Sequence, residues 1–210
     1  MMNTNEWFVF DGGTIDKKTC TKIKNWAKDK WRPSSVDTSK DITDEERKTG
    51  RKGDYKPDPK QRISDIAWCN DQWLYDIIWP IMQRANDEAG WRYHIKAAQT
   101  AQITRYKKGG FYNFHYDGNG DHLSVYDRPA NAFIHGHVRK LSMSVMLNNN
   151  FDGGAFEFAS YNNEECIITP IEASSGSVIV FPSSAEHRVA PVTKGIRYSL
   201  VAWFVGPPFV

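Results

Sequence analysis

Apolar residues recur at helical spacing in two segments of the first ninety residues. The first segment follows Thr14 and Asp16, either of which suits a helix start, and its apolar positions are Ile15, Ile23, Trp26, Ala27 and Trp31. The second segment runs from Asp71 to Ala89, and its apolar stripe consists of Trp73, Leu74, Ile77, Ile78, Ile81, Met82, Ala85 and Ala89. Gly90 suits the stop that follows. The pattern predicts two amphipathic helices.

A polar stretch, residues 32–62, separates the two predicted helices. It is rich in charged and turn-forming residues, which is typical of a solvated surface loop. Long loops also carry function, so a movable lid over a substrate site is the alternative interpretation.

Beyond Gly90 the pattern changes to short runs that suit strands, with turn residues between them. The runs are WRYHI (91–95), AQITRY (101–106), FYNFHYD (111–117), RKLSMSVML (139–147), GAFEF (154–158), GSVIVF (176–181) and IRYSLVAWF (196–204). In the fourth run, Leu141, Met143, Val145 and Leu147 share one face. No helical pattern separates the runs, which argues against a parallel sheet of βαβ units. We therefore expect a sandwich, a barrel or a jelly roll.

The composition fits one globular domain. The chain has 210 residues, 40% of them hydrophobic, and a net charge of +2, which is too small to indicate nucleic acid as the main partner. The first residues lack a signal-peptide pattern, and no apolar run reaches the roughly 18 residues of a membrane span. Three scattered cysteines, Cys20, Cys69 and Cys166, show no disulfide or zinc pattern. We expect a cytoplasmic protein without a membrane or nucleic-acid partner.

Three residues in the strand region are candidate metal ligands. His115 and Asp117 stand two apart in a predicted strand, so their side chains point to the same face. His187 follows the strand 176–181. Two histidines and one carboxylate form a facial triad, which leaves open positions on a non-haem Fe(II) ion. A structural zinc site would contain more cysteine or histidine.

Arg197 is a candidate anion-binding residue. It lies in the last predicted strand with Ser199 two residues further on, so both can face the same interior. A guanidinium inside a barrel is costly unless it meets an anion, and its planar fork suits a carboxylate. The Ser199 hydroxyl can donate to the same carboxylate.

Residues 98–204 resemble the 2-oxoglutarate/Fe(II)-dependent dioxygenase superfamily, and within it the prolyl 4-hydroxylase-like group. The matching pieces come in the order of that family: the strand pair ending in His115-Tyr116-Asp117, the stretch through the turn Gly153-Gly154, and the segment with His187 and Arg197. The ordered set is more specific than any single motif.

The resemblance implies an α+β, mainly β fold with a double-stranded β-helix (jelly-roll) core and flanking N-terminal helices. We expect a single domain over 1–210, in which 1–90 is the helical flanking region and 91–210 the core. The resemblance further implies iron ligation by His115, Asp117 and His187, and 2-oxoglutarate binding by Arg197 with Tyr106. L-ascorbate supports activity in many relatives as a reductant.

The implied activity couples decarboxylation of 2-oxoglutarate to succinate with C–H hydroxylation, and O2 is the co-substrate. Asp117 favours hydroxylation over halogenation, because halogenating relatives lack that carboxylate. The expected substrate is a prolyl residue in a protein or peptide. A free amino acid or another small molecule is the alternative substrate, and a non-catalytic jelly roll that senses 2-oxoglutarate or metal is the alternative function.

The insertion 118–139 contains candidate substrate-binding residues. If it covers the active site, Tyr126, Arg128 and His137 contact the substrate; otherwise they are loop residues. Trp203 shares the strand parity of Arg197 and Ser199, so it either walls the cofactor pocket or fills the core.

Overall fold

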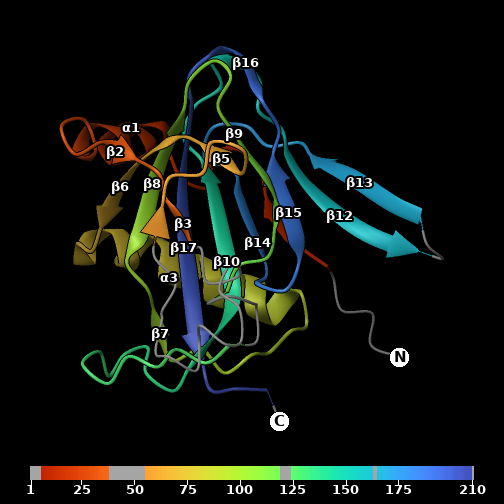
Figure 1. The fold of residues 1–210 in the computed structure, drawn as a ribbon. Coiled ribbons are helices and arrows are strands. Elements are labelled where there is room, and N and C mark those ends of the chain that lie inside the picture. The colour runs from red at the N-terminus through yellow and green to blue at the C-terminus, as the bar shows by residue number, and fades with distance from the viewer. Residues whose placement is uncertain (1–5, 38–54, 119–123, 163–164, 210) are drawn as a thin grey trace.

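The computed structural model describes residues 6–37, 55–118, 124–162 and 165–209 (Figure 1). Antiparallel strands dominate, and two helices accompany them. In chain order the elements are β1 (Phe8–Phe10), α1 (Lys17–Trp26), β2 (Arg32–Pro33), β3 (Val36–Asp37), β4 (Tyr55–Lys56), β5 (Arg62–Ile63), β6 (Asp65–Cys69), α3 (Gln72–Glu88), β7 (Ala97–Ala98), β8 (Ala101–Tyr106), β9 (Phe111–His115), β10 (Val138–Met146), β11 (Phe151–Gly153), β12 (Phe156–Asn162), β13 (Glu165–Ile171), β14 (Val178–Pro182), β15 (Glu186–Val189), β16 (Val192–Gly195) and β17 (Arg197–Gly206).

Two sheets form the jelly-roll core that the resemblance predicted. The large sheet has the order β1-β14-β10-β17-β8-β6-β2, with β7 also paired to β17. The small sheet has the order β13-β12-β15-β9-β5. Two short ribbons, β11-β16 and β3-β4, complete the described pairings. Apart from the consecutive pair β12-β13, neighbouring strands of the two sheets are far apart in the chain, so the fold depends on non-local pairing.

The large sheet has one apolar face and one mixed face, on which buried polar groups lie beside a second, smaller apolar cluster. On β10, Leu141, Met143 and Val145 belong to the main core, whereas the buried Ser142 and Ser144 have the opposite parity. Strands β17 and β8 repeat this division, with Ala101, Ile103, Leu200, Ala202 and Phe204 in the main core and Gln102, Thr104, Arg197 and Ser199 buried on the other side. The alternation seen in the sequence therefore separates a packing face from a face that holds polar groups.

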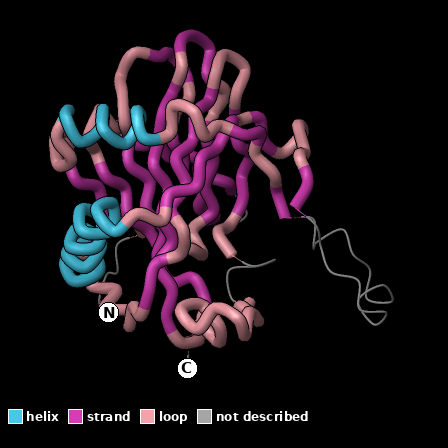
Figure 2. Tube along the Cα trace, turned by 90° about the vertical axis from the view of Figure 1, so that its left-hand side faces the viewer, coloured by secondary structure: helices cyan, strands magenta, loops and turns pink. Residues whose placement is uncertain are grey.

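Both predicted helices are confirmed, and they pack on the apolar face of the large sheet. Figure 2 shows them together on one side of the strands. The Asp16 side chain caps α1 by accepting a hydrogen bond from the Thr19 N–H at 2.9 Å. α3 ends before Gly90, whose φ of 78° suits the predicted stop. The face of α3 in the main core comprises Leu74, Ile78, Met82 and Ala85.

The expectation that residues 1–90 are only a helical flank was incomplete. β1 pairs with β14 and β6 pairs with β8, so this region extends the large sheet at both ends. β5 likewise adds to the small sheet through β9. Unpaired strand edges expose backbone groups, and these short strands cover them. The lid interpretation of 32–62 depends mainly on residues 38–54, which lie outside the described residues.

The predicted strand 91–95 is wrong. In this segment the Asn86 side chain hydrogen-bonds to both backbone groups of Tyr93. It accepts from the Tyr93 N–H at 3.0 Å and donates to the Tyr93 carbonyl at 2.9 Å. Those backbone groups are therefore not available for hydrogen bonds to a neighbouring strand. The chain also turns at Arg92, which has a φ of 51°. The structure also adds β13 and β15, which the pattern did not predict. Among the described residues, no helix is both long and apolar enough to cross a membrane.

Leu200 tests the main core, because its side chain is fully buried between the large sheet and the helices. Leu200→Ala is expected to lower the free energy of unfolding by about 2–5 kcal/mol, since the lost contacts leave a cavity. Urea denaturation followed by circular dichroism measures the change. Ile167→Ala on β13 is the control. Because Ile167 is 46% exposed, this substitution should lower the free energy of unfolding far less. Equal losses in the two variants would contradict this assignment of the core.

Candidate functional site

The pairing of β9 with β15 brings the three predicted metal ligands together. His115 at the end of β9 lies directly opposite His187 on β15 in the antiparallel register. Asp117 follows β9 by two residues, and its backbone N–H donates to the Ser183 carbonyl at 3.0 Å. Residues from two distant parts of the chain thus converge on one point.

The side chains of this cluster are close enough to share one ion. His187 Nε2 lies 3.6 Å from Asp117 Oδ2, and His115 Nε2 lies 3.8 Å from Asp117 Oδ1. The ligand atoms of all three residues lie within 4.8 Å of one another. Two imidazoles and one carboxylate suit a first-row transition metal and leave further coordination positions open.

Backbone carbonyls fix both histidines in the tautomer that a metal needs. His115 Nδ1 donates to the Asn113 carbonyl at 2.8 Å, and His187 Nδ1 donates to the Ala185 carbonyl at 2.9 Å. Since a carbonyl can only accept, the proton sits on Nδ1 and the lone pair on Nε2. Burial, reinforced by the nearby His187, lowers the pKa of His115 to about 3, so its imidazole is neutral.

Asp117 is buried and ionised. Burial by itself would raise its pKa, but His187, His115 and Arg139 together hold the pKa of this carboxyl below its ordinary value. Arg139 Nη1 lies 3.9 Å from Asp117 Oδ1, and its guanidinium stacks 4.2 Å from the centre of the Trp203 ring. The Gln99 side chain fixes Arg139 further by accepting from its Nε at 2.7 Å.

Arg139 was not predicted as a site residue, because strand parity alone would have pointed its side chain toward the helices. Arg139 has the parity of Leu141, which faces the helices. A β-bulge between these two residues shifts the register against β17 and turns Arg139 toward Asp117 instead. The bulge depends on the pairing of β10 with β17, which the local sequence does not show.

The second predicted feature is a buried guanidinium. Arg197 is 0% exposed and lies opposite Tyr106 in the register of β17 with β8. Its Nη1 donates to Ser199 Oγ at 3.1 Å, whereas Nε and Nη2 are buried without a hydrogen-bond partner among the described residues. Burial lowers its pKa, yet an arginine stays protonated in proteins. Two unsatisfied N–H groups on one fork match a carboxylate.

Gly154 gives Arg197 room. A Cβ at this glycine would lie 3.0 Å from Arg197 Cδ and 2.9 Å from a methyl of Val192. Its φ of 63° is also one that glycine adopts most readily. The Gly153-Gly154 turn seen in the sequence therefore borders the anion-binding candidate.

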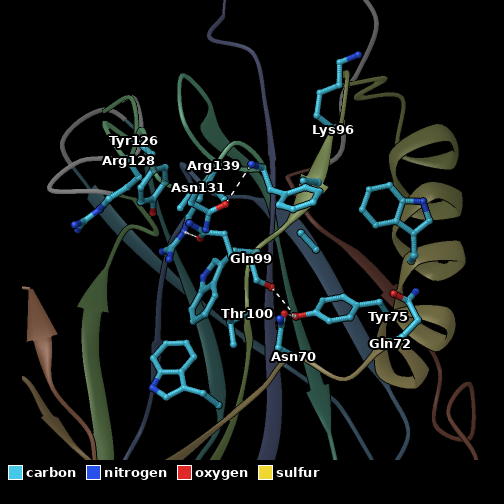
Figure 3. A pocket seen from close by; sticks show the side chains of 17 residues that line it. Asn70, Gln72, Tyr75, Lys96, Gln99, Thr100, Tyr126, Arg128, Asn131 and Arg139 are labelled. Atoms are coloured by element: carbon cyan, nitrogen blue, oxygen red, sulfur yellow. Dashed lines mark hydrogen bonds between the residues drawn. The ribbon is translucent and has the colours of Figure 1, made fainter.

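A cavity of about 610 Å³ has Arg139, the neighbour of Asp117, in its lining (Figure 3). Its walls come from residues 96–100, the start of α3 and the described residues 126–134, and Arg139 and Trp203 also line it. Arg139 thus belongs to the cavity and contacts Asp117. Trp203 borders this cavity, so it is a wall residue as well as a packing residue.

Two of the three predicted substrate residues line this cavity. Tyr126 and Arg128 do so, and Tyr126 is buried. His137 does not, because its Nδ1 interacts with the Phe133 carbonyl at 3.2 Å and its own carbonyl accepts from the Tyr126 N–H. The end of the insertion thus folds back on itself; residues 119–123 lie outside the described part.

Comparison with known proteins bears directly on this arrangement. A sequence model described as the 2OG-Fe(II) oxygenase superfamily matches residues 101–205, half of the chain. The matched segment contains both candidate clusters. A PKHD-type hydroxylase of Xylella fastidiosa (strain M12) is 32% identical over 104 residues, which cover 49% of this chain and 42% of that protein. The chain thus spans less than half the length of this curated relative.

Solved structures share the fold. A prolyl-4-hydroxylase of Pseudomonas putida has a TM-score of 0.62 at 16% identity, with 96% of this chain and 92% of that chain covered. A prolyl hydroxylase of Trichoplax adhaerens, in complex with a peptide fragment of the hypoxia inducible factor oxygen degradation domain, has a TM-score of 0.64 at 18% identity, with 97% and 84% covered. At these identities the likeness concerns the fold.

Asp117→Ala is expected to abolish binding of a divalent metal, because it removes the one anionic ligand of the cluster. Loss of partners beyond the ligands costs 10–100-fold in metal affinity, so loss of a ligand should exceed about 100-fold. Calorimetric titration with Mn(II) measures this. Asp152→Ala is the matched control, since Asp152 is exposed and lies outside the cluster. Retained affinity in Asp117→Ala would contradict the ligand set.

Proposed function

The chain belongs to the 2OG-Fe(II) oxygenase superfamily, and on that premise we propose that it is a 2-oxoglutarate- and Fe(II)-dependent dioxygenase that hydroxylates a prolyl residue of a protein or peptide. The observation that carries the proposal is the presence of a two-histidine, one-carboxylate cluster together with a buried guanidinium whose Nε and Nη2 have no acceptor among the described residues. The first suits Fe(II), and the second suits a dicarboxylate.

His115, Asp117 and His187 are the proposed iron ligands. The protein prepares them before any metal arrives, because both imidazoles are held through Nδ1 with Nε2 turned toward the cluster, and the carboxylate is ionised. When bound, Fe(II) and 2-oxoglutarate supply the oxidising chemistry, in which 2-oxoglutarate and O2 yield succinate, carbon dioxide and one oxygen atom for the C–H bond. The residues of the chain bind, orient and shield these reactants.

Arg197, Ser199 and Tyr106 are the proposed 2-oxoglutarate residues. The free Nε and Nη2 donors of Arg197 can take the distal carboxylate in a bidentate pair, and Ser199 lies beside them. Tyr106 is buried, with its ring 5.5 Å from the guanidinium carbon, so it walls this end of the site. Such a pair in a dry interior is far stronger than at the surface.

The cavity beside Arg139 is the proposed substrate site, with Tyr126, Arg128 and Trp203 among its walls. It opens to solvent, because Phe133 on its lining is 75% exposed and Trp68 is 38% exposed. An open mouth favours a chain segment over a small enclosed molecule. The printed names of the relatives, hydroxylases and prolyl hydroxylases, support the same substrate class.

Residues 1–210 are proposed to act as one domain. The main core contains residues of α1 and α3 together with residues of β8, β10, β14 and β17. The N-terminal region and the jelly roll thus bury the same apolar surface, so neither part has a separate core.

Arg197→Met is expected to abolish 2-oxoglutarate binding without destabilising the ligand-free protein. The substitution removes a buried charge that lacks acceptors, so the free energy of unfolding should stay equal or rise. In the presence of Mn(II), 2-oxoglutarate at 100 times its own dissociation constant should raise the free energy of unfolding of the original protein by about 2.7 kcal/mol. The same addition should leave the free energy of unfolding of Arg197→Met unchanged. Urea denaturation without oxygen measures both effects.

The matched control for that experiment is Arg105→Met. Arg105 stands on the same strand pair as Tyr106 but forms a half-exposed ion pair with Asp65 at 2.8 Å. Its loss should leave the response to 2-oxoglutarate intact. A large loss of stability in ligand-free Arg197→Met, or a retained response, would contradict the role of Arg197.

Iron-loaded protein is expected to form succinate from 2-oxoglutarate in air, slowly even without a substrate. His187→Ala and Arg197→Met should lower this rate at least about 100-fold, because each removes a group that holds a reactant. Asp152→Ala should retain it. Binding of 2-oxoglutarate without any succinate would instead support the sensor alternative.

A further inference from the structure

We propose that the substrate peptide is acidic, carrying carboxylate side chains beside the target residue. This inference rests on the proposed function, because it assigns chemistry to the same cavity. Three cationic side chains, Lys96, Arg128 and Arg139, line that cavity, and no aspartate or glutamate lines it among the residues whose positions are described.

The three cations span the cavity from its interior to its rim. Arg139 is half-buried next to Asp117, whereas Lys96 and Arg128 are exposed. In the view of Figure 3, Arg139 lies between Arg128 on one side and Lys96 on the other. A chain segment that crosses the cavity would therefore meet positive charge near the metal site and again at the rim.

Two acidic side chains close to the cavity, Asp76 and Asp127, lie outside its lining. Asp76 accepts a hydrogen bond from Gln72 at 2.9 Å outside the lining, and Asp127 lies 3.7 Å from His135 and is 89% exposed. Asp117 is a proposed iron ligand, so its charge is shared with the metal. The rim cations are left to attract an anionic partner.

The uncharged lining suits a peptide better than a nucleic acid. Amide side chains at Asn70, Gln72, Gln99 and Asn131 offer both donors and acceptors, as peptide backbone groups require. Aromatic side chains, including Trp68 and Phe133, supply apolar contact at the mouth. Among the described residues, two exposed cations border the cavity, and the net charge of the chain is +2, whereas nucleic-acid sites carry extensive basic surface.

The test uses three 15-residue peptides with a central proline that are identical except at four flanking positions, which carry Glu, Gln or Lys. Binding to the Mn(II)- and 2-oxoglutarate-loaded protein is measured by calorimetry without oxygen, and stimulated succinate formation is measured with iron in air. The Glu peptide is expected to bind about tenfold more tightly than the Lys peptide at low salt. The difference should shrink at about 0.5 M salt, because exposed charges are screened.

Charge reversal at the rim locates the effect. Lys96→Glu and Arg128→Glu should each reduce the preference for the Glu peptide at least about threefold. Lys108→Glu is the matched control, since Lys108 is exposed and follows the other end of β8, about 20 Å along that strand from Ala101. Thermal unfolding of each variant verifies that it is folded.

Equal binding of the three peptides, no binding of any, or an equal effect of Lys108→Glu would overturn the proposal. Displacement of the Glu peptide by oligothymidine at lower concentration than by unlabelled Glu peptide would overturn it in favour of a nucleic acid. In each case, iron-dependent succinate formation without peptide would show that the oxygenase assignment stands. Absence of that basal reaction together with absence of Mn(II) binding would mean that the proposed function has failed.

Discussion

The pairing of β9 with β15 sets His115 opposite His187, and the rest of the candidate site is arranged around that contact. Two imidazoles on paired strands form one side of a metal cluster, and the chain needs only to turn after β9 to bring in Asp117. A single register shift would send one histidine to the other face of the small sheet. The hydrogen bonds from Nδ1 to backbone carbonyls in turn require this strand geometry.

Such a site is costly to build, because it buries polar groups before any ligand arrives. Arg197 keeps two unsatisfied donors in the interior, and Asp117 is ionised although it is buried. The apolar face of the large sheet offsets this cost through the core that it shares with α1 and α3. Stability and chemistry therefore reside on opposite faces of the same strands, which explains why alternate residues of β10 and β17 differ so sharply in polarity.

Much of the separation between core residues and site residues could be predicted from the sequence, because it depends on local periodicity. The spacing of His115 and Asp117, the parity of Arg197 with Ser199 and the stripe of α3 all involve residues within a few positions of one another. What escaped prediction depends on contacts that the periodicity of a single helix or strand does not show. The β-bulge that turns Arg139 inward requires β17, and the backbone of Tyr93 is taken by Asn86 rather than by a strand. The cavity joins segments that are far apart in the chain, so no local pattern shows it.

The charges of the proposed site also favour one kind of substrate. Asp117 contributes one negative charge, and Arg139 and Arg197 contribute one positive charge each. Bound Fe(II) would bring two positive charges and 2-oxoglutarate two negative charges, while an imidazole that ligates a metal through Nε2 and keeps its Nδ1 proton carries no charge. These groups together would keep one positive charge, the buried Arg62 adds another beside His115, and Arg139 is the cation of this set that lines the cavity. In a partly buried setting such a charge is stabilised by an anion and destabilised by a cation. A substrate carboxylate near Arg139 would therefore offset positive charge that the protein, the metal and the co-substrate together leave uncompensated.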